Sequence, residues 1–178
     1  MTQPLRTDPP DDRFEALGQV VERAAVMEIA LRMAFCTLLG GPYAAAVAGS
    51  QDTHWLIENC DAVLRRYAEK TTRQREAIRS ALHLCREANR ARNKLVHEAW
   101  GTGAAGESTA LQSLCRSYQV AGREWTVAQI REAAEAISRA QHALLAAVEN
   151  AFGPGCLQAA EELLAADAAH DRNQRPSQ

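Results

Sequence analysis

Residues 72–100 read TRQREAIRSALHLCREANRARNKLVHEAW, and this stretch decides the fold. At about 100° per residue, its apolar residues fall on one arc of a helical wheel, which predicts a long amphipathic helix. The arc comprises Ile78, Ala81, Leu84, Cys85, Ala88, Ala91, Leu95, Val96 and Ala99. Arg92 falls inside the arc, and burying an unpaired charge is prohibitive. We therefore expect Arg92 to meet a carboxylate, or the arc to open onto a cleft or a second subunit.

The composition of the chain favours a single all-α domain. Of its 178 residues, 47% are hydrophobic, 24% are charged and only 5% are aromatic. Alanine is abundant and β-branched runs are scarce, which favours helix over strand. No apolar stretch reaches the roughly 20 residues that span a bilayer. Residues 1–10 lack the layout of a secretory signal, so we expect a cytoplasmic protein without a membrane segment.

Turn signals divide the chain into an antiparallel bundle of four to five helices. The main helices are predicted at about 11–39, 52–68, 72–100 and 126–152, with shorter ones at 43–48 and 156–168. Thr126 and Gln129 form a capping-box pattern at the start of the last main helix. Residues 101–125 are interpreted as a small hairpin or an irregular connection. The expected layout is a disordered arm at 1–10, one domain at 11–168 and a polar tail at 169–178.

The cysteines and histidines indicate neither a metal site nor a disulfide framework. The five cysteines stand singly, their number is odd, and no Cys-x-x-Cys pair occurs, which fits reduced thiols buried as small hydrophobic groups. They are Cys36, Cys60, Cys85, Cys115 and Cys156. No cofactor is expected.

The charge is unevenly distributed along the chain. The net charge is −2, but residues 73–94 contain seven basic and two acidic residues, a local balance of +5. The helical wheel gathers Arg86, Asn89 and Arg90 with His97 on one polar side, and we predict that Arg86, Asn89, Arg90 and Lys94 bind RNA. The alternative is an ordinary solvated helix face.

The first predicted helix contains a carboxylate on its apolar stripe. Glu28 stands in the middle of a row that comprises Leu17, Val20, Val21, Ala24, Leu31, Phe35 and Leu38. We predict that Glu28 faces Arg92 or its immediate neighbourhood and orients the guanidinium as a supporting group. The alternative is that Glu28 reaches solvent or pairs with Arg32 on its own helix.

The hexapeptide RNKLVH at residues 92–97 resembles the signature of the HEPN superfamily (higher eukaryotes and prokaryotes nucleotide-binding domain). That signature is an arginine, usually followed by Asn, Asp or His, and then a histidine after four to six residues. Arg92, Asn93 and His97 match it. Arg90 also satisfies the loose spacing, but Ala91 follows it, so Arg92 is the better match. The match covers six residues, and the expected helical layout extends the resemblance over about 11–152.

The resemblance implies a helical bundle of the HEPN type, commonly a homodimer in which two motifs meet across a cleft. It also implies a metal-independent endoribonuclease that acts on RNA in a toxin–antitoxin or antiviral defence system. An antitoxin or another regulatory protein is then an expected partner. Some members of the superfamily are inactive and only bind, so the alternative is a non-catalytic module that binds nucleic acid, a nucleotide or a protein.

The chemistry of RNA cleavage assigns a role to each residue of the motif. Cleavage without a metal requires a base for the 2′-hydroxyl proton, cationic stabilisation of the phosphorane and an acid for the leaving 5′-oxygen. His97 suits the base or acid role, and Arg92 suits phosphate binding. Asn93 is expected to orient His97 or to donate to a phosphate oxygen. A third interpretation is an unrelated helical interaction protein in which RNKLVH has no chemical role.

Overall fold

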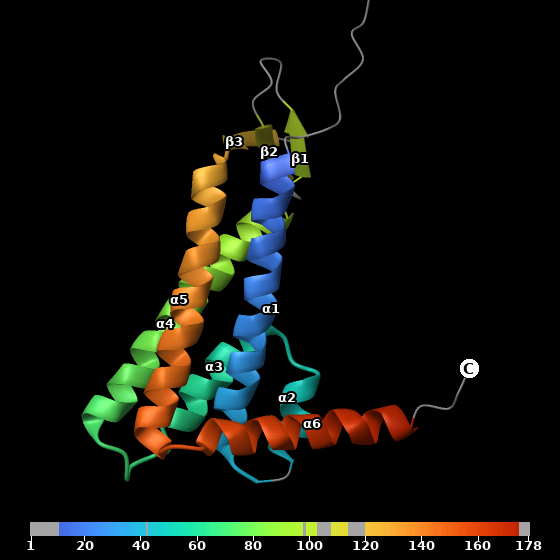
Figure 1. Ribbon diagram of the computed structural model, residues 1–178. Coiled ribbons are helices and arrows are strands. Elements are labelled where there is room, and N and C mark those ends of the chain that lie inside the picture. Colours follow the sequence, from blue (N-terminus) through green and yellow to red (C-terminus); the bar gives the residue numbers. More distant parts are fainter. Residues whose placement is uncertain (1–10, 42, 98, 103–107, 114–119, 175–178) are drawn as a thin grey trace, which may run out of the picture.

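The computed structural model describes residues 11–41, 43–97, 99–102, 108–113 and 120–174, and side chains are described for 12–41, 43–96, 125–170 and 172. Figure 1 shows the bundle, with a small sheet at one end and the last helix crossing the other end. The elements are α1 (Asp11–Leu39), α2 (Ala44–Gly49), α3 (Thr53–Leu64), α4 (Thr72–His97), β1 (Ala99–Thr102), β2 (Ser108–Ser113), β3 (Val120–Glu124), α5 (Val127–Phe152) and α6 (Cys156–Gln174). The helical bundle is confirmed.

The bundle consists of three long helices, α1, α4 and α5, and a shorter fourth helix, α3 (Figure 1). Helix α4 runs towards the sheet and α5 runs away from it, so the two helices are antiparallel. In contrast, α1 and α5 run parallel, which departs from a fully antiparallel bundle. Arg13 donates to the carbonyl of Trp125 at 3.4 Å, and Arg23 pairs with Glu135 at 2.6 Å, so the two contacts join residues 112 positions apart.

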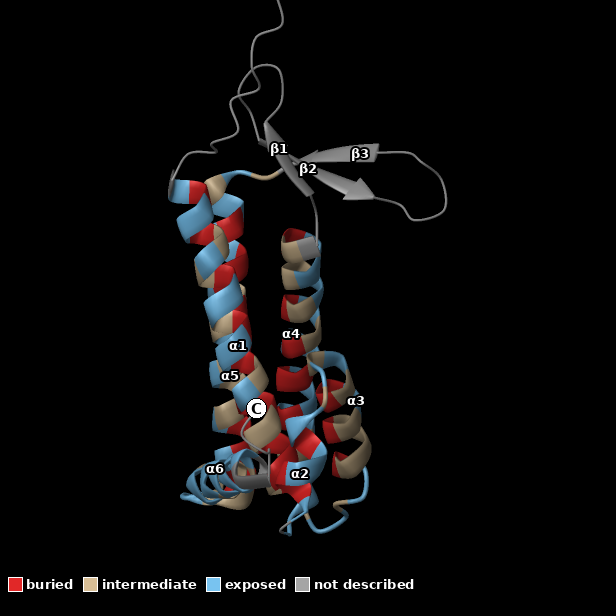
Figure 2. Ribbon diagram, turned by 90° about the vertical axis from the view of Figure 1, so that its right-hand side faces the viewer, coloured by how far each residue is buried: buried red, intermediate tan, exposed pale blue. Residues whose placement is uncertain are grey.

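The short helix α3 covers only one half of the groove between α1 and α4. Its first residue, Thr53, contacts Glu28 in the middle of α1, and Tyr67, just beyond its end, donates its hydroxyl proton to the carbonyl of Leu38. At 1.5 Å per residue, the 12 residues of α3 span about 18 Å and the 26 residues of α4 about 39 Å. Figure 2 shows that α3 runs beside only the part of α4 that is farther from the sheet.

The core lies between α1, α3, α4 and α5 and is built largely from aliphatic side chains. Its largest fully buried members are Met27, Leu31, Leu38, Leu56, Ile57, Leu64, Ile78, Leu82, Leu95, Ile130, Ile137 and Leu144. Two predicted core residues are instead exposed, because Val21 is 48% and Leu84 47% accessible. Val21 borders the uncovered half of the groove. On α4, contact with α3 extends the buried arc towards Leu82 and leaves Leu84 at its open edge.

Three predicted boundaries were wrong. The helix expected to reach Trp100 ends at His97, and the one expected to reach about residue 68 ends at Leu64. The final helix continues to Gln174, six residues into the expected polar tail. Strands β1, β2 and β3 form an antiparallel sheet in that order. Of the two alternatives predicted for residues 101–125, a hairpin or an irregular connection, the sheet agrees with the hairpin. Trp and Thr residues favour strand over helix, which explains the early end of α4.

The predicted capping box at α5 is confirmed, because the Thr126 hydroxyl accepts from the Gln129 amide and the Gln129 side chain accepts from Thr126. We expect Thr126→Ala to lower the free energy of unfolding by about 0.5–2 kcal/mol, since the backbone N–H of Gln129 loses its acceptor. Urea denaturation monitored by circular dichroism measures this loss. The control is Ser80→Ala on the exposed face of α4, and an equal loss there would contradict the capping argument.

Three of the four described cysteines are buried in the core, and the fourth, Cys156, is half-buried. Burial raises the pKa of Cys85 to about 12, and burial with the nearby Asp167 carboxylate raises the pKa of Cys36 to about 11. A raised thiol pKa stabilises the fold below the ordinary thiol pKa of about 8.5 and loses this contribution as pH rises through the folded value. We therefore expect the free energy of unfolding to fall above about pH 9.

The same burial protects these thiols from alkylation. We expect iodoacetamide at pH 8 to modify Cys156 before Cys36, Cys60 and Cys85, because only a solvated thiolate reacts. Peptide mass spectrometry after timed quenching measures the order. Equal rates in the folded protein and in urea for Cys85 would contradict the buried placement.

Candidate functional site

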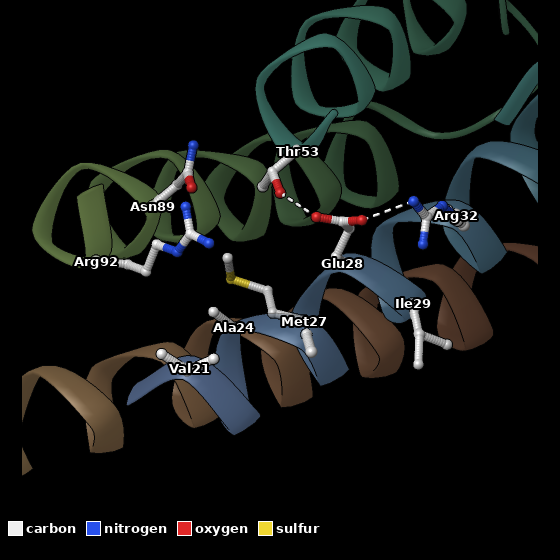
Figure 3. A pocket seen from close by; sticks show the side chains of 10 residues that line it. Val21, Ala24, Met27, Glu28, Ile29, Arg32, Thr53, Asn89 and Arg92 are labelled. Atoms are coloured by element: carbon white, nitrogen blue, oxygen red, sulfur yellow. Dashed lines mark hydrogen bonds and ion pairs between the residues drawn. The ribbon is translucent and has the colours of Figure 1, made fainter. Parts of the chain in front are cut away.

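A pocket of about 270 Å³ opens between α1, the beginning of α3 and the end of α4, in the half of the groove that α3 leaves uncovered (Figure 3). The wall that α1 forms is apolar apart from Glu28 and Arg32. The facing side is polar and contains Asn89 and Arg92 of α4 and Thr53 of α3. The complete lining is Val21, Ala24, Ala25, Met27, Glu28, Ile29, Arg32, Thr53, Asn89 and Arg92.

Arg92 extends from α4 over this pocket, and its guanidinium lies near Asn89 and above Met27 (Figure 3). Its Nη1 donates to the Oδ1 atom of Asn93 at 2.9 Å. Its Nε is buried and has no hydrogen-bond partner within the described part of the chain. An unsatisfied buried donor of a charged group is costly, so Arg92 is poised to bind an acceptor that enters the pocket. Of the two expectations for Arg92, the opening of the apolar arc onto a cleft is the one observed.

Glu28 lies in the neighbourhood of Arg92, because both line this pocket, but its carboxylate pairs with Arg32, which was the alternative considered for it. Its Oε1 accepts from Arg32 at 2.6 Å, and its Oε2 accepts from the Thr53 hydroxyl at 2.8 Å. The i,i+4 spacing brings the side chain of Arg32 next to that of Glu28 on the same helix. Glu28 therefore pairs with Arg32 and not with the more distant Arg92 on α4. Glu28 is therefore a structural link between α1 and the first turn of α3.

The remaining residues of the motif occupy the last two turns of α4. Asn93 and Lys94 are exposed, and the Asn93 amide oxygen accepts a hydrogen bond from Arg92. His97 is the last residue of α4, and its side chain lies outside the described residues. The backbone thus places Arg92, Asn93 and His97 together at the sheet end of the groove, within about 8 Å of helix axis.

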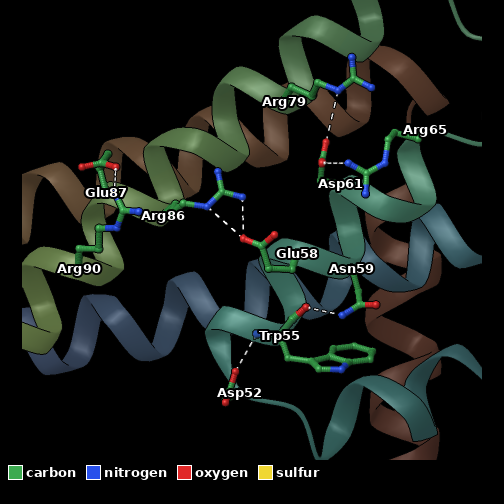
Figure 4. A network of polar contacts seen from close by, with 10 residues as sticks. All are labelled: Asp52, Trp55, Glu58, Asn59, Asp61, Arg65, Arg79, Arg86, Glu87 and Arg90. Carbon is green, nitrogen blue, oxygen red and sulfur yellow. Dashed lines mark hydrogen bonds and ion pairs between the residues drawn. The ribbon is translucent and has the colours of Figure 1, made fainter.

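The predicted RNA-binding face of α4 is partly neutralised by carboxylates (Figure 4). Arg86 donates through Nε and Nη2 to Glu58 of α3, at 3.1 and 2.8 Å. The Arg86 hydrogen bond lowers the pKa of Glu58 against a smaller opposing effect of burial. Arg90 pairs with Glu87 at 2.6 Å. Two of the four residues expected to bind RNA therefore already hold a carboxylate partner.

A second ion-pair cluster lies further down the same interface, where Asp61 binds Arg79 at 3.3 Å and Arg65 at 2.7 Å. These pairs are about one-quarter to three-fifths exposed, so each contributes little to stability, but together they fix the orientation of α3. The pairing was missed from the sequence. The signal was available, since α3 contains only acidic charges and Arg79 and Arg86 are seven residues apart on one face of α4.

Comparisons with known proteins returned no match to a family model, to a curated protein or to a solved structure. Among the described residues, no three His, Cys, Asp or Glu side chains converge as metal ligands. None of the helices within the described ranges is long and apolar enough to cross a bilayer.

Proposed function

We propose that the protein is a metal-independent endoribonuclease of the HEPN type that acts as a homodimer, with a role as a toxin or antiviral effector. The observation that carries the proposal is the position of Arg92. Its guanidinium lies on the wall of an open pocket, its Nε has no partner among the described residues, and it stands one and a half helical turns before His97. A phosphate oxygen would satisfy this donor.

The proposed reaction uses the RNA's own 2′-hydroxyl as the nucleophile. His97 of one protomer accepts the 2′-hydroxyl proton, the 2′-oxygen forms a bond to phosphorus, and the bond to the 5′-oxygen breaks. His97 of the partner subunit protonates the leaving 5′-oxygen. Arg92 stabilises the charge that develops on the phosphorane. The products are a 2′,3′-cyclic phosphate and a 5′-hydroxyl end.

The test is cleavage of a labelled RNA in buffer with EDTA, with analysis of both product ends. We expect cleavage to persist in EDTA and the new ends to be a cyclic phosphate and a 5′-hydroxyl. A matched RNA with 2′-deoxyribose at the cleaved position should resist, because it lacks the nucleophile. Loss of cleavage in EDTA, or cleavage of the deoxy substrate, would contradict this mechanism.

A second candidate is a non-catalytic module of the same fold that binds nucleic acid, a nucleotide or a protein such as an antitoxin. The ion pairs of Arg86 with Glu58 and of Arg90 with Glu87 favour it, because they leave fewer cations to hold a long RNA. Binding of RNA without cleavage, by wild type and His97→Ala alike, would select this candidate.

A further inference from the structure

The pocket between α1, α3 and α4 has two chemically different ends. At one end lies the Arg92 guanidinium, whose buried Nε has no partner in the described ranges. At the other end, the Glu28 carboxylate accepts from Arg32 at 2.6 Å and from the Thr53 hydroxyl at 2.8 Å. Figure 3 shows the two ends on opposite sides of the space above Met27. A ligand with an anionic part and a neutral part therefore enters with its anion at Arg92.

Asn89 stands one turn of α4 before Arg92 and lines the space between the two ends (Figure 3). Its side chain is half-buried, and no residue that the structure describes forms a hydrogen bond with its amide. A primary amide holds a donor and an acceptor side by side. This pair matches the edge of a nucleobase, and an asparagine bound to adenine through both atoms is a common way to read that base. Asn89 is therefore suited to bind a base that enters the pocket.

The floor of the pocket suits the flat face of a base. It is formed by Val21, Ala24 and Met27 of α1. Bases that leave a stack pack on apolar and aromatic surfaces, and a thioether sulfur makes favourable contacts with aromatic rings. The pocket volume of about 270 Å³ lies just below the roughly 300–1,000 Å³ of pockets that hold drug-sized ligands. The pocket therefore has room for one base and not for several.

The polar groups at the Glu28 end favour a base with an amino group. The Thr53 hydroxyl has given its proton to Glu28, so its oxygen can only accept, and an ionised carboxylate also only accepts. Arg32 lies one turn further along α1, where its Nε and Nη2 donate to the carbonyls of Ala48 and Gln51. Adenine and cytosine carry an amino group next to a ring-nitrogen acceptor. Guanine and uracil carry a carbonyl group at the corresponding position, which these acceptors repel.

We propose that the pocket is a subsite for one adenine or cytosine base of RNA, read by Asn89. The Asn89 Oδ1 atom accepts from the amino group, Nδ2 donates to the neighbouring ring nitrogen, and the second amino hydrogen faces Thr53. Arg92, about 4.5 Å further along the helix axis, holds a phosphate of the same nucleotide. The position of this nucleotide beside the cleaved bond rests on the proposed function, whereas recognition of the base stands on the pocket alone.

Nucleotide binding tests the subsite without any cleavage. In ¹H–¹⁵N NMR titrations of the full chain, 5′-AMP should shift the Asn89 side-chain amide and bind at least about fivefold more tightly than 5′-IMP, in which a carbonyl replaces the amino group. The pair of CMP and UMP makes the same exchange on a pyrimidine, so the two pairs distinguish adenine from cytosine. Equal affinities within both pairs, tighter binding of IMP or UMP, or no binding at millimolar nucleotide would overturn the proposal.

Two variants with matched controls locate the base. Asn89→Leu keeps nearly the same side-chain size and should remove the preference for the amino-bearing nucleotides, whereas Asn150→Leu, at an exposed position on α5, should keep it. Ala25 is exposed and lines the pocket, so Ala25→Trp should obstruct it and weaken AMP and CMP binding severalfold. Ala146→Trp on the exposed face of α5 should not. Equal behaviour of each variant and its control would overturn the placement of the base.

Sequencing of the ends that wild type produces from a random RNA pool separates this inference from the proposed function. We expect adenine or cytosine at one fixed position beside the cut, and loss of this preference in Asn89→Leu. Cleavage without the preference would overturn the subsite and retain the nuclease. Selective binding of AMP or CMP by a chain that never cleaves RNA would uphold the subsite and remove the proposed function.

Discussion

Under the proposed nuclease mechanism, His97→Ala should reduce RNA cleavage by about 10²–10⁴-fold, the range for loss of a general acid–base group. Arg92→Ala should reduce it by about 10²–10³-fold, because the developing phosphorane charge loses its main donor. These are the largest functional effects that the site predicts. The measurement is the single-turnover rate constant on a labelled RNA at saturating enzyme, which separates the chemical step from RNA binding.

The control for this experiment is His83→Ala. His83 is an exposed histidine on the same helix, 14 residues before His97, and it does not line the pocket. The His83→Ala variant should cleave RNA at the wild-type rate. Wild-type rates for both histidine variants would place the chemistry elsewhere in the chain, and equal losses would point to damage of α4 instead of a catalytic role.

Leu31→Ala should lower the free energy of unfolding by about 2–5 kcal/mol, a large share of the 5–15 kcal/mol of an ordinary domain. Leu31 is fully buried on α1, and its carbonyl receives the Cys60 thiol of α3 at 3.9 Å, so the residue lies where these helices meet. Truncation leaves a cavity that the surrounding helices cannot close. Urea denaturation with a two-state fit measures the change.

Leu84→Ala is the matched control, because the same side chain is removed from α4 at a position that is 47% exposed. Its cost should stay within about 1 kcal/mol. If both variants lose the same free energy, the assignment of Leu31 to the core and of Leu84 to the surface is contradicted.

The sequence allowed the helices to be predicted well where a local signal defines each end. Gly40 after α1 and the Thr126 and Gln129 pair before α5 are such signals, and both boundaries agree with the structure. Prediction failed where contacts between distant parts of the chain determine the direction and the length of a helix. Nothing in the sequence indicates that α1 and α5 run parallel, or that α3 stops halfway along α4 and leaves Val21 exposed.

The same distinction holds for the candidate site. Placing Arg92 on an apolar arc was enough to predict either a carboxylate partner or a cleft, and the cleft is what the structure contains. Glu28 was correctly recognised as unusual on its stripe, but its partner was assigned wrongly. Pairing with Arg32, the stated alternative, follows from the spacing along one helix, whereas the contact with Thr53 depends on the distance between two helices, which a helical wheel does not give.

The parallel pairing of α1 with α5 has a consequence during synthesis. The residues joined by this pairing are 112 positions apart, as in the contact between Arg23 and Glu135. A ribosome adds about 5–20 residues per second, so α1 waits roughly 6–22 s for its main partner to be translated. Throughout this interval the apolar side of α1 that packs on α5 remains uncovered. A chaperone that recognises such helices is therefore expected to engage the N-terminal third of the polypeptide before α5 emerges.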